Sequence, residues 1–181
     1  DKPIQGVGYY YRAYSSDRFV LSSLPHMVGS SELQAAGVKS TRQPSLLIED
    51  FEGDWKKQWF AYKPDDWAVS THKIYTEEWK APTGARLAFE VRADQANKLA
   101  VGLDGSAAEV VLQGGPDWQP VVLEAANFLN AANEPLKDWS GAKELRLGAK
   151  ETLSGKTNKE VGGNWQGSPP QFRNLRWVVG S

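Results

Sequence analysis

Short alternations of apolar and polar residues fill the chain from residue 46 to its end, and they constrain the fold more than any other feature. In RLAFEVRA (residues 86–93) Leu87, Phe89 and Val91 alternate with a set that includes Arg86, Glu90 and Arg92. In KLAVGLD (98–104) Leu99, Val101 and Leu103 share one face in the same way. Four further segments continue it between turn residues: AAEVVLQ, QPVVLE, KELRLGA and FRNLRWVV. Because side chains on a strand point alternately to opposite faces, this pattern predicts many short strands. We therefore expect an all-β fold, a β-sandwich or barrel.

Residues 1–45 have a different pattern and are expected to be an N-terminal extension or the tail of a preceding domain, followed by the sandwich over 46–181. They contain one strand-like run, Phe19 to Leu21, and a candidate short helix in SSELQAAGV that begins at Ser30 or Ser31. The polar, Gly-rich stretch over 150–171 is expected to be a long loop before the last strand. Long loops in compact domains often bind ligands.

Composition narrows the classes of partner. The formal net charge is −1, so the chain lacks the concentrated basic surface that nucleic acids require. No apolar run approaches the ~18–20 residues of a membrane span. The chain has no cysteine and begins with Asp1. These features lead us to expect a processed chain or a piece of a larger bacterial protein, secreted, extracellular or periplasmic, with no nucleic-acid or membrane partner.

Aromatic residues are the unusual part of the composition, with eight Trp, six Tyr and six Phe. Many of them fall in EDFEGDWKKQWFAYKPDDW, residues 49–67. There we expect Phe51 and Phe60 to pack inward and four rings to be exposed: Trp55, Trp59, Tyr62 and Trp67. Two other tryptophans, Trp118 and Trp177, are expected in the core, and Trp139 is expected to close one end of the sandwich. Trp79 and Trp165 are flanked by charges or turn residues, which is typical of loops and strand ends.

The order of motifs resembles that of the galactose-binding-like jelly-roll domains used as carbohydrate-binding modules. LLIEDFEGDW matches their first strand, DWQPVVLEAANF and PLKDWSGAKELRLG match internal segments, and FRNLRWVV matches the last strand. The resemblance covers about three-quarters of the chain. It implies a structural calcium ion, for which the matching positions are Asp50, Glu52 and Asn174. Acids of the family's last strand are replaced here by Arg173 and Asn174, and an arginine would oppose the ion.

Sugar binding would explain the aromatic residues. The C–H face of a sugar ring stacks on an aromatic ring, and its hydroxyls need polar partners at the rim. The candidate carbohydrate-binding residues are Trp55, Trp59, Tyr62, Trp67, Tyr75, Trp79, Arg92 and Trp165. On the strand faces opposite the core, Ala100 and Gly102 would leave room for a sugar chain. Three arginines there could bind the carboxylates or sulfates of an acidic polysaccharide: Arg86, Arg92 and Arg146.

These features together predict a non-catalytic polysaccharide-binding module, a part of a larger exported carbohydrate-active enzyme, that needs no cofactor beyond the implied calcium. Two alternatives remain open. The exposed aromatics could instead dock the domain against other domains of a multidomain parent enzyme. A small glycan-active hydrolase could use paired carboxylates, for which the candidates are Asp50, Glu52, Asp54 and Asp66. On a strand, the first three of these acids would share one face.

Overall fold

A computed structural model describes residues 44–62 and 67–180 of the chain. The chain divides between Gln43 and Pro44, and everything described below belongs to the second unit. The expected strand at Phe19–Leu21 and the expected helix near Ser30 lie outside the described residues. Among the described residues, no helix is long and apolar enough to cross a membrane.

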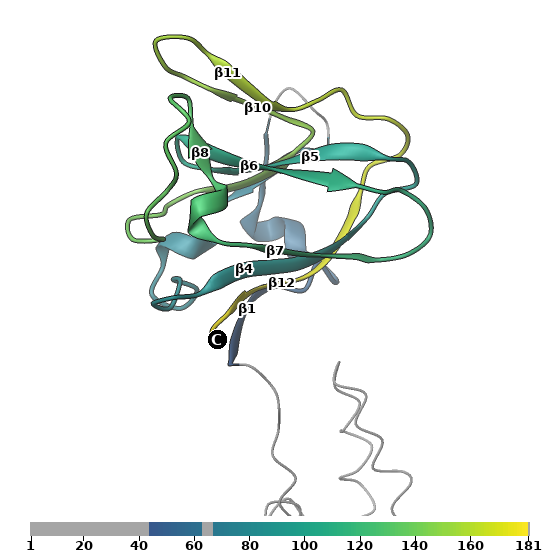
Figure 1. The fold of residues 1–181 in the computed structure, drawn as a ribbon. Helices are drawn as coiled ribbons and strands as arrows, with labels where there is room; N and C mark the ends of the chain where they lie inside the picture. The colour runs from purple at the N-terminus through teal and green to yellow at the C-terminus, as the bar shows by residue number, and fades with distance from the viewer. Residues whose placement is uncertain (1–43, 63–66, 181) are drawn as a thin grey trace, which may run out of the picture. The chain divides into compact units, whose positions relative to one another are not determined.

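Two antiparallel sheets form the body of the unit (Figure 1). The first, sheet A, has the strand order β1-β12-β4-β7. Its strands are β1 (Ser45–Glu49), β12 (Gln171–Val178), β4 (Arg86–Arg92) and β7 (Gln119–Leu123). The second, sheet B, has the order β2-β3-β9-β5-β6-β8. Its strands are β2 (Phe60–Ala61), β3 (Val69–Thr71), β9 (Leu145–Gly148), β5 (Asn97–Leu103), β6 (Ser106–Leu112) and β8 (Leu129–Asn130). Three short 3-10 helices lie between strands: η3 (Trp55–Gln58), η4 (Lys73–Tyr75) and η5 (Ala125–Asn127).

The all-β sandwich expected from the sequence is confirmed, and each of the six alternating segments contains a strand. The chain passes repeatedly between the two sheets, and it stays within sheet B only at β2–β3, β5–β6 and β8–β9. The last strand, β12, lies between β1 and β4. The two sheets pack face to face as a β-sandwich. Asp104, with φ 48°, and Gly105 make the tight turn of the β5–β6 hairpin.

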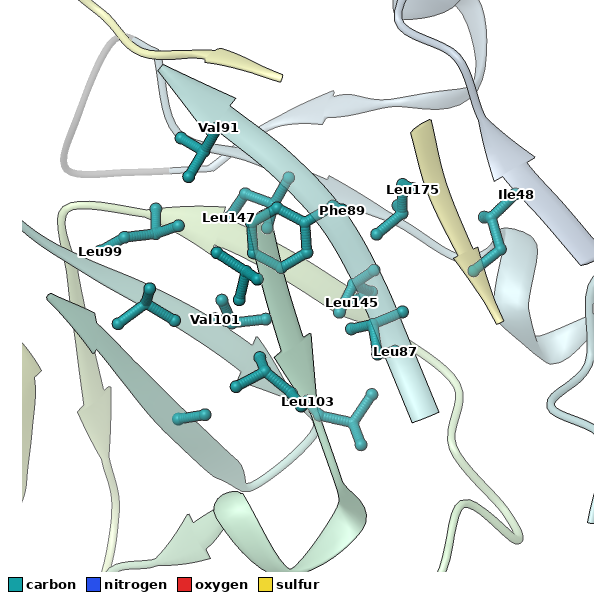
Figure 2. Packing of buried hydrophobic residues seen from close by; sticks show 14 of the residues in the cluster. Ile48, Leu87, Phe89, Val91, Leu99, Val101, Leu103, Leu145, Leu147 and Leu175 are labelled. Carbon is teal, nitrogen blue, oxygen red and sulfur yellow. The ribbon is translucent and has the colours of Figure 1, made fainter. Parts of the chain in front are cut away.

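The core lies between the sheets. Figure 2 shows Leu87, Phe89 and Val91 of β4 facing side chains of β5 and β9. The opposing residues are Leu99, Val101, Leu103, Leu145 and Leu147. All eight are nearly inaccessible to solvent, because the inward-facing half of each alternation meets the inward-facing half of the other sheet. Leu175 of β12 and Ile48 of β1 extend the same layer.

A hairpin covers part of the outer face of sheet B. It consists of β10 (Lys150–Leu153) and β11 (Lys159–Gly162), which pair only with each other and lie beyond β5 and β6 from sheet A (Figure 1). Leu153 and Val161 bury Ala100 of β5 beneath them. The expected loop over 150–171 is therefore wrong in its first half. The expected sugar-binding floor at Ala100 and Gly102 is wrong too, because side chains of the protein occupy that space.

Trp177 lies in the core as expected, and Trp139 is buried beside it. Trp177 on β12 is 1% exposed and donates its indole N–H to the Trp79 carbonyl at 2.8 Å. Trp139 packs against it, with ring centroids 4.9 Å apart, and donates to the Ala85 carbonyl at 2.6 Å. Both indoles thus bury their area without leaving an unpaired N–H.

The predicted orientations of Trp59 and Phe60 are wrong. Trp59 is only 6% exposed, and its indole N–H donates to the buried Glu49 carboxylate at 3.0 Å. Lys73 pairs with the same carboxylate at 3.0 Å. Phe60 on β2 points outward and is 57% exposed. The helix η3 ends at Gln58, so the strand phase begins with Trp59 inward, and a shift of one residue exchanges the two faces.

Candidate functional site

A surface groove of about 750 Å³ lies where five segments meet. We call it the aromatic groove. Its walls come from the loop after β1, helix η3, the β2–β3 segment, the residues before β7, and the start of β12 with the loop before it. The lining residues are Asp50, Phe51, Glu52, Trp55, Lys56, Trp59, Ala61, Trp67, Val69, Trp118, Pro169, Pro170, Gln171, Phe172 and Arg173.

A chain of ring contacts builds the apolar part of the groove. Phe51 meets Trp55 edge to face at 5.0 Å, and Trp55 meets Trp59 in the same way at 5.8 Å. Trp67 contacts Trp165 at 4.7 Å, and Trp165 is held by its N–H bond to the Ser168 carbonyl at 2.8 Å. Such edge-to-face pairs fix ring orientation. Because these side chains support one another, the groove is formed before any ligand arrives.

Trp118 was expected in the core but is half-buried in the groove wall. The guanidinium of Arg173 lies 4.3 Å from its ring centroid and that of Arg92 lies 4.8 Å away. Two cations on one indole are favourable because the ring face carries negative charge density. Trp118 therefore links the groove to the arginines of sheet A.

Charged groups are also among the lining residues. Asp50, Glu52 and Lys56 are exposed lining residues, and the Asp50 carboxylate accepts the backbone N–H of Glu52 at 2.8 Å. Strand β1 ends at Glu49, so the expectation that Asp50, Glu52 and Asp54 share one strand face is wrong. The groove thus combines stacked rings with both signs of charge.

Arg173 and Asn174, which stand where the resemblance would place acids, both contact the Glu90 carboxylate. Arg173 binds the Glu90 carboxylate through two nitrogens, at 2.7 and 3.2 Å, and the Asn174 amide donates to the same carboxylate at 2.9 Å. The Arg173 hydrogen bond lowers the pKa of Glu90. Burial opposes this, and Asn174 together with the charges of Arg173 and Arg176 adds to it.

The calcium expectation is not supported by a visible cluster of acids. Within residues 44–62 and 67–180, no group of three His, Cys, Asp or Glu side chains could hold a metal ion. Of the three positions implied by the resemblance, Asp50 and Glu52 line the groove, whereas the Asn174 amide is turned to Glu90. A calcium site here stays a prediction.

Glu90→Gln is expected to lower the free energy of unfolding by about 1–2 kcal/mol at neutral pH. The folded-state pKa of Glu90 lies below its ordinary value of 4.5. The stabilisation by the carboxylate is therefore complete above pH 4.5 and is lost as the pH falls through the lowered value. Urea unfolding of both proteins from pH 7 to pH 3 should show their difference shrinking with acid.

Glu160→Gln is the control for this experiment, because the Lys150–Glu160 pair is long, at 3.8 Å, and exposed. Its effect should be near zero at every pH. A Glu90→Gln difference that stays constant or grows on acidification would contradict the assignment.

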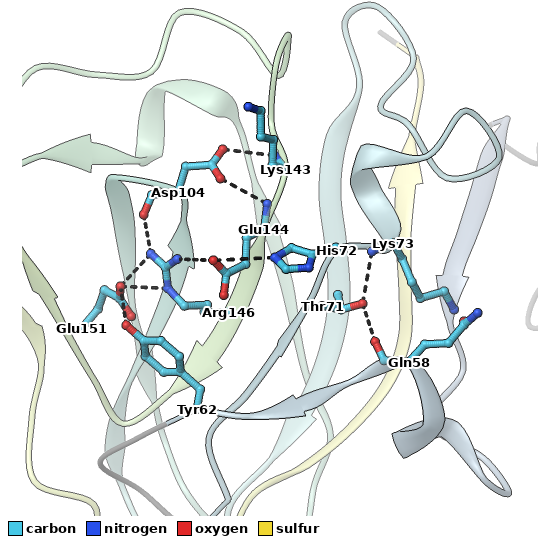
Figure 3. Close-up of polar contacts among 10 residues, drawn as sticks. All are labelled: Gln58, Tyr62, Thr71, His72, Lys73, Asp104, Lys143, Glu144, Arg146 and Glu151. Carbon is cyan, nitrogen blue, oxygen red and sulfur yellow. Dashed lines mark hydrogen bonds and ion pairs between the residues drawn. The ribbon is translucent and has the colours of Figure 1, made fainter.

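A second polar cluster, the Arg146 cluster, lies on the outer side of sheet B (Figure 3). Arg146 was expected to face a ligand, but it is buried and pairs with Glu151 at 2.6 Å and Glu144 at 3.2 Å. It also donates to the Asp104 carbonyl. Burial acts to lower the pKa of Arg146, but the Glu151 hydrogen bond and charge outweigh it and raise that pKa. The cluster fastens β10 to β9 and so anchors the covering hairpin.

Tyr62 belongs to the Arg146 cluster and is not a lining residue of the groove. Its hydroxyl donates to Glu151 at 3.2 Å, and its ring lies 5.3 Å from the Arg146 guanidinium. Burial and the Glu151 charge raise the pKa of Tyr62, with Arg146 opposing them. The expectation that Tyr62 is freely exposed is therefore wrong.

The structure brings together about half of the predicted carbohydrate-binding residues. Trp55, Trp59 and Trp67 line the groove, while Trp165 and Arg92 contact residues that line it. Tyr75 is exposed and Trp79 packs on the core under Lys73, and neither is among the lining residues. Sequence reasoning missed Gln171, Phe172 and the Pro169–Pro170 pair. Only the Trp165–Pro170 cluster of ring and turn residues could have indicated them.

The described unit is an all-β sandwich with an aromatic groove at the surface. No family model, no curated protein and no solved structure matches the chain. Its function is therefore argued from the groove itself.

Proposed function

We propose that the unit is a non-catalytic polysaccharide-binding module of the galactose-binding-like class and that the aromatic groove holds the sugar chain. The observation that carries this proposal is one groove lined by three half-buried tryptophans and by charged side chains. The tryptophans are Trp55, Trp67 and Trp118. We further propose that the module belongs to a larger exported carbohydrate-active enzyme.

The chemistry of the groove suits a sugar better than a wholly apolar ligand. Indole faces can stack on the C–H face of a pyranose, and Asp50, Lys56 and Gln171 can exchange hydrogen bonds with its hydroxyls. A groove of about 750 Å³ is within the usual size range of ligand sites. Binding of this kind needs positioned rings and no reacting group.

The two other functions receive less support. Large exposed apolar side chains are dispersed over both sheets and η4 instead of forming one docking patch: Leu47, Phe60, Tyr75, Val111 and Val122. A glycan hydrolase needs two carboxylates facing each other across a cleft. Asp50 and Glu52 instead lie two residues apart on one loop, with Asp50 bonded to the Glu52 backbone.

Affinity electrophoresis through gels that contain a panel of neutral and acidic polysaccharides tests the proposal. At least one polymer should retard the protein. Trp55→Ala and Trp67→Ala should each weaken binding about tenfold or more, because aromatic anchors at an interface commonly contribute ~2 kcal/mol. Gels run with a calcium chelator test whether the implied calcium is needed.

Phe60→Ala is the matched control, since it removes an exposed ring that lies outside the groove. It should migrate like the parent protein in every gel. Absence of retardation across the whole panel would overturn the proposed function, as would equal losses from Phe60→Ala and Trp67→Ala.

A further inference from the structure

The outward face of sheet A carries a concentration of arginines that the overall charge of −1 conceals. We call it the arginine face, defined by Arg86 and Arg92 of β4 and by Arg173 and Arg176 of β12. The strand register places these side chains on one face of the sheet, and the core residues Leu87, Phe89 and Val91 of β4 on the other. Among the outward residues of the four strands, the only carboxylate is Glu90. Four positive charges and one negative charge leave an excess of three on the strands, and Glu124, directly after β7 and lining the same pocket as Arg86, lowers it to two at that end of the sheet.

A bulge in β12 creates this arrangement. Arg173 pairs with Glu90 and Arg176 pairs with Ala88, so three steps along β12 correspond to two along β4. Without the extra residue, positions 173 and 176 would point to opposite faces. Asn174 within the bulge has φ 56°, a left-handed conformation that is costly for a residue with a side chain. The bulge therefore costs local backbone strain at Asn174, and it makes both Arg173 and Arg176 face outward.

Three of the four guanidinium groups have only neutral partners. Arg92 donates to the Gln171 side chain and to the Pro116 carbonyl, and Arg176 donates to the Asn174 carbonyl at 3.4 Å. Arg86 donates to the Gly180 carbonyl at 3.1 Å. Among the described residues, no carboxylate lies within ion-pairing distance of these three side chains. Glu90 is already engaged by Arg173 and Asn174.

The arginine face is continuous with the aromatic groove. Arg173 lines the groove, and Arg92 and Arg173 both contact Trp118, which also lines it. Cross-strand neighbours continue this surface over the sheet. Gln171 lies beside Arg92, and Arg176 lies in line with Ala88 and Val122. A ligand chain that stacks in the groove can therefore extend over the arginines without leaving the surface.

We propose that the polysaccharide held by this module is acidic, and that its carboxylate or sulfate groups bind the arginine face. This inference rests on the proposed function and names its ligand class. Guanidinium groups suit these anions because their planar N–H donors match two oxygens at once. Asp50 and Glu52 line the groove and would repel the carboxylates or sulfates of the ligand. We therefore assign the uncharged sugar rings to the groove and the acidic groups of the polysaccharide to sheet A.

The test compares acidic polymers with neutral counterparts of the same backbone in affinity gels. The pairs are polygalacturonate with its methyl ester, and a sulfated galactan with its desulfated form. At least one acidic polymer should retard the protein about tenfold more strongly than its counterpart, and salt at about 0.5 M should remove most of the excess. The two pairs distinguish carboxylate from sulfate.

Arg86→Gln/Arg176→Gln, which alters two arginines that do not contact the groove, should lose about tenfold in affinity for the acidic polymer and keep its affinity for the neutral one. Lys143→Gln/Lys156→Gln is the matched control, because it removes two exposed positive charges outside sheet A. It should behave as the parent protein does. The comparison of polymers and the salt dependence use the unaltered protein, so they remain decisive even if the arginine variant fails to fold.

The outcomes separate this inference from the proposed function. Equal retardation by acidic and neutral polymers, or equal losses in the arginine and lysine variants, would overturn the acidic ligand and leave polysaccharide binding intact. Loss of all retardation from every polymer would overturn both. Stronger salt-sensitive retardation by single-stranded DNA than by either acidic polymer would also overturn the inference, in favour of a nucleic acid.

Discussion

Arg146→Met is expected to lower the free energy of unfolding by about 3–5 kcal/mol, because it leaves a buried carboxylate without its partner. Glu151 is 4% exposed, and Arg146 is its cationic partner, at 2.6 Å. The loss should also loosen the β10–β11 hairpin, which the pair fastens to β9. Urea unfolding followed by tryptophan fluorescence measures the stability, and amide hydrogen exchange over 150–162 measures the loosening.

The double variant Arg146→Met/Glu151→Leu separates two contributions to stability: the cost of leaving the Glu151 carboxylate buried without a partner, and the net stabilisation by the ion pair itself. Replacing both members with apolar side chains removes the buried charge and should recover much of the lost stability. If the single variant costs less than about 1 kcal/mol, or the double variant is the less stable of the two, then the pair is not the buried and coupled unit described above.

Trp177→Ala is expected to cost about 3–5 kcal/mol of stability, the range typical of removing a large aromatic side chain from a core. The substitution would leave a cavity beside Trp139 and remove the hydrogen bond to the Trp79 carbonyl. Thermal and urea unfolding measure the effect. Because the domain is small, a change of this size should lower the melting temperature by many degrees.

Trp118→Ala provides the contrast, because the same atoms are removed from a half-buried ring in the groove wall. Its main contacts are the guanidinium groups of Arg92 and Arg173, worth about 0.5–1 kcal/mol each at exposed sites. We expect a loss of about 1–2 kcal/mol and a clear loss of polysaccharide binding. Similar stability losses in both variants would show that the division between core and groove tryptophans is wrong.

Much of the fold could be predicted because its strands follow the simplest sequence pattern. Leu87, Phe89 and Val91 alternate with charges, and both the strand and its inward face follow from that alternation. The prediction failed where the chain changes phase. At Trp59 and Phe60 the single turn of η3 sets which residue of the pair faces inward, and the sequence carries no signal for that offset.

The candidate site was harder to predict because it is assembled from distant segments. Trp55 and Trp67 are close in the sequence and were identified as ligand-binding rings. Trp118 and Phe172 reach the same groove from more than 50 residues away, and only tertiary structure places them there. The resemblance makes Asn174 a candidate calcium ligand and Arg173 a charge that would oppose the ion. Their actual contact, the Glu90 carboxylate, lies on a neighbouring strand.

The first and last strands of the sandwich lie side by side, with Ser45 opposite Val178 and the Val179 N–H bonded to the Pro44 carbonyl at 2.9 Å. Figure 1 accordingly places the label C beside β1. The chain thus enters and leaves this unit at one corner. Tension applied between Pro44 and Gly180 would load the hydrogen bonds of this strand pair one after another, starting at that corner, instead of all together. A pulling force on these two ends would therefore separate β1 from β12 one hydrogen bond at a time, and the unit would resist such a force only weakly.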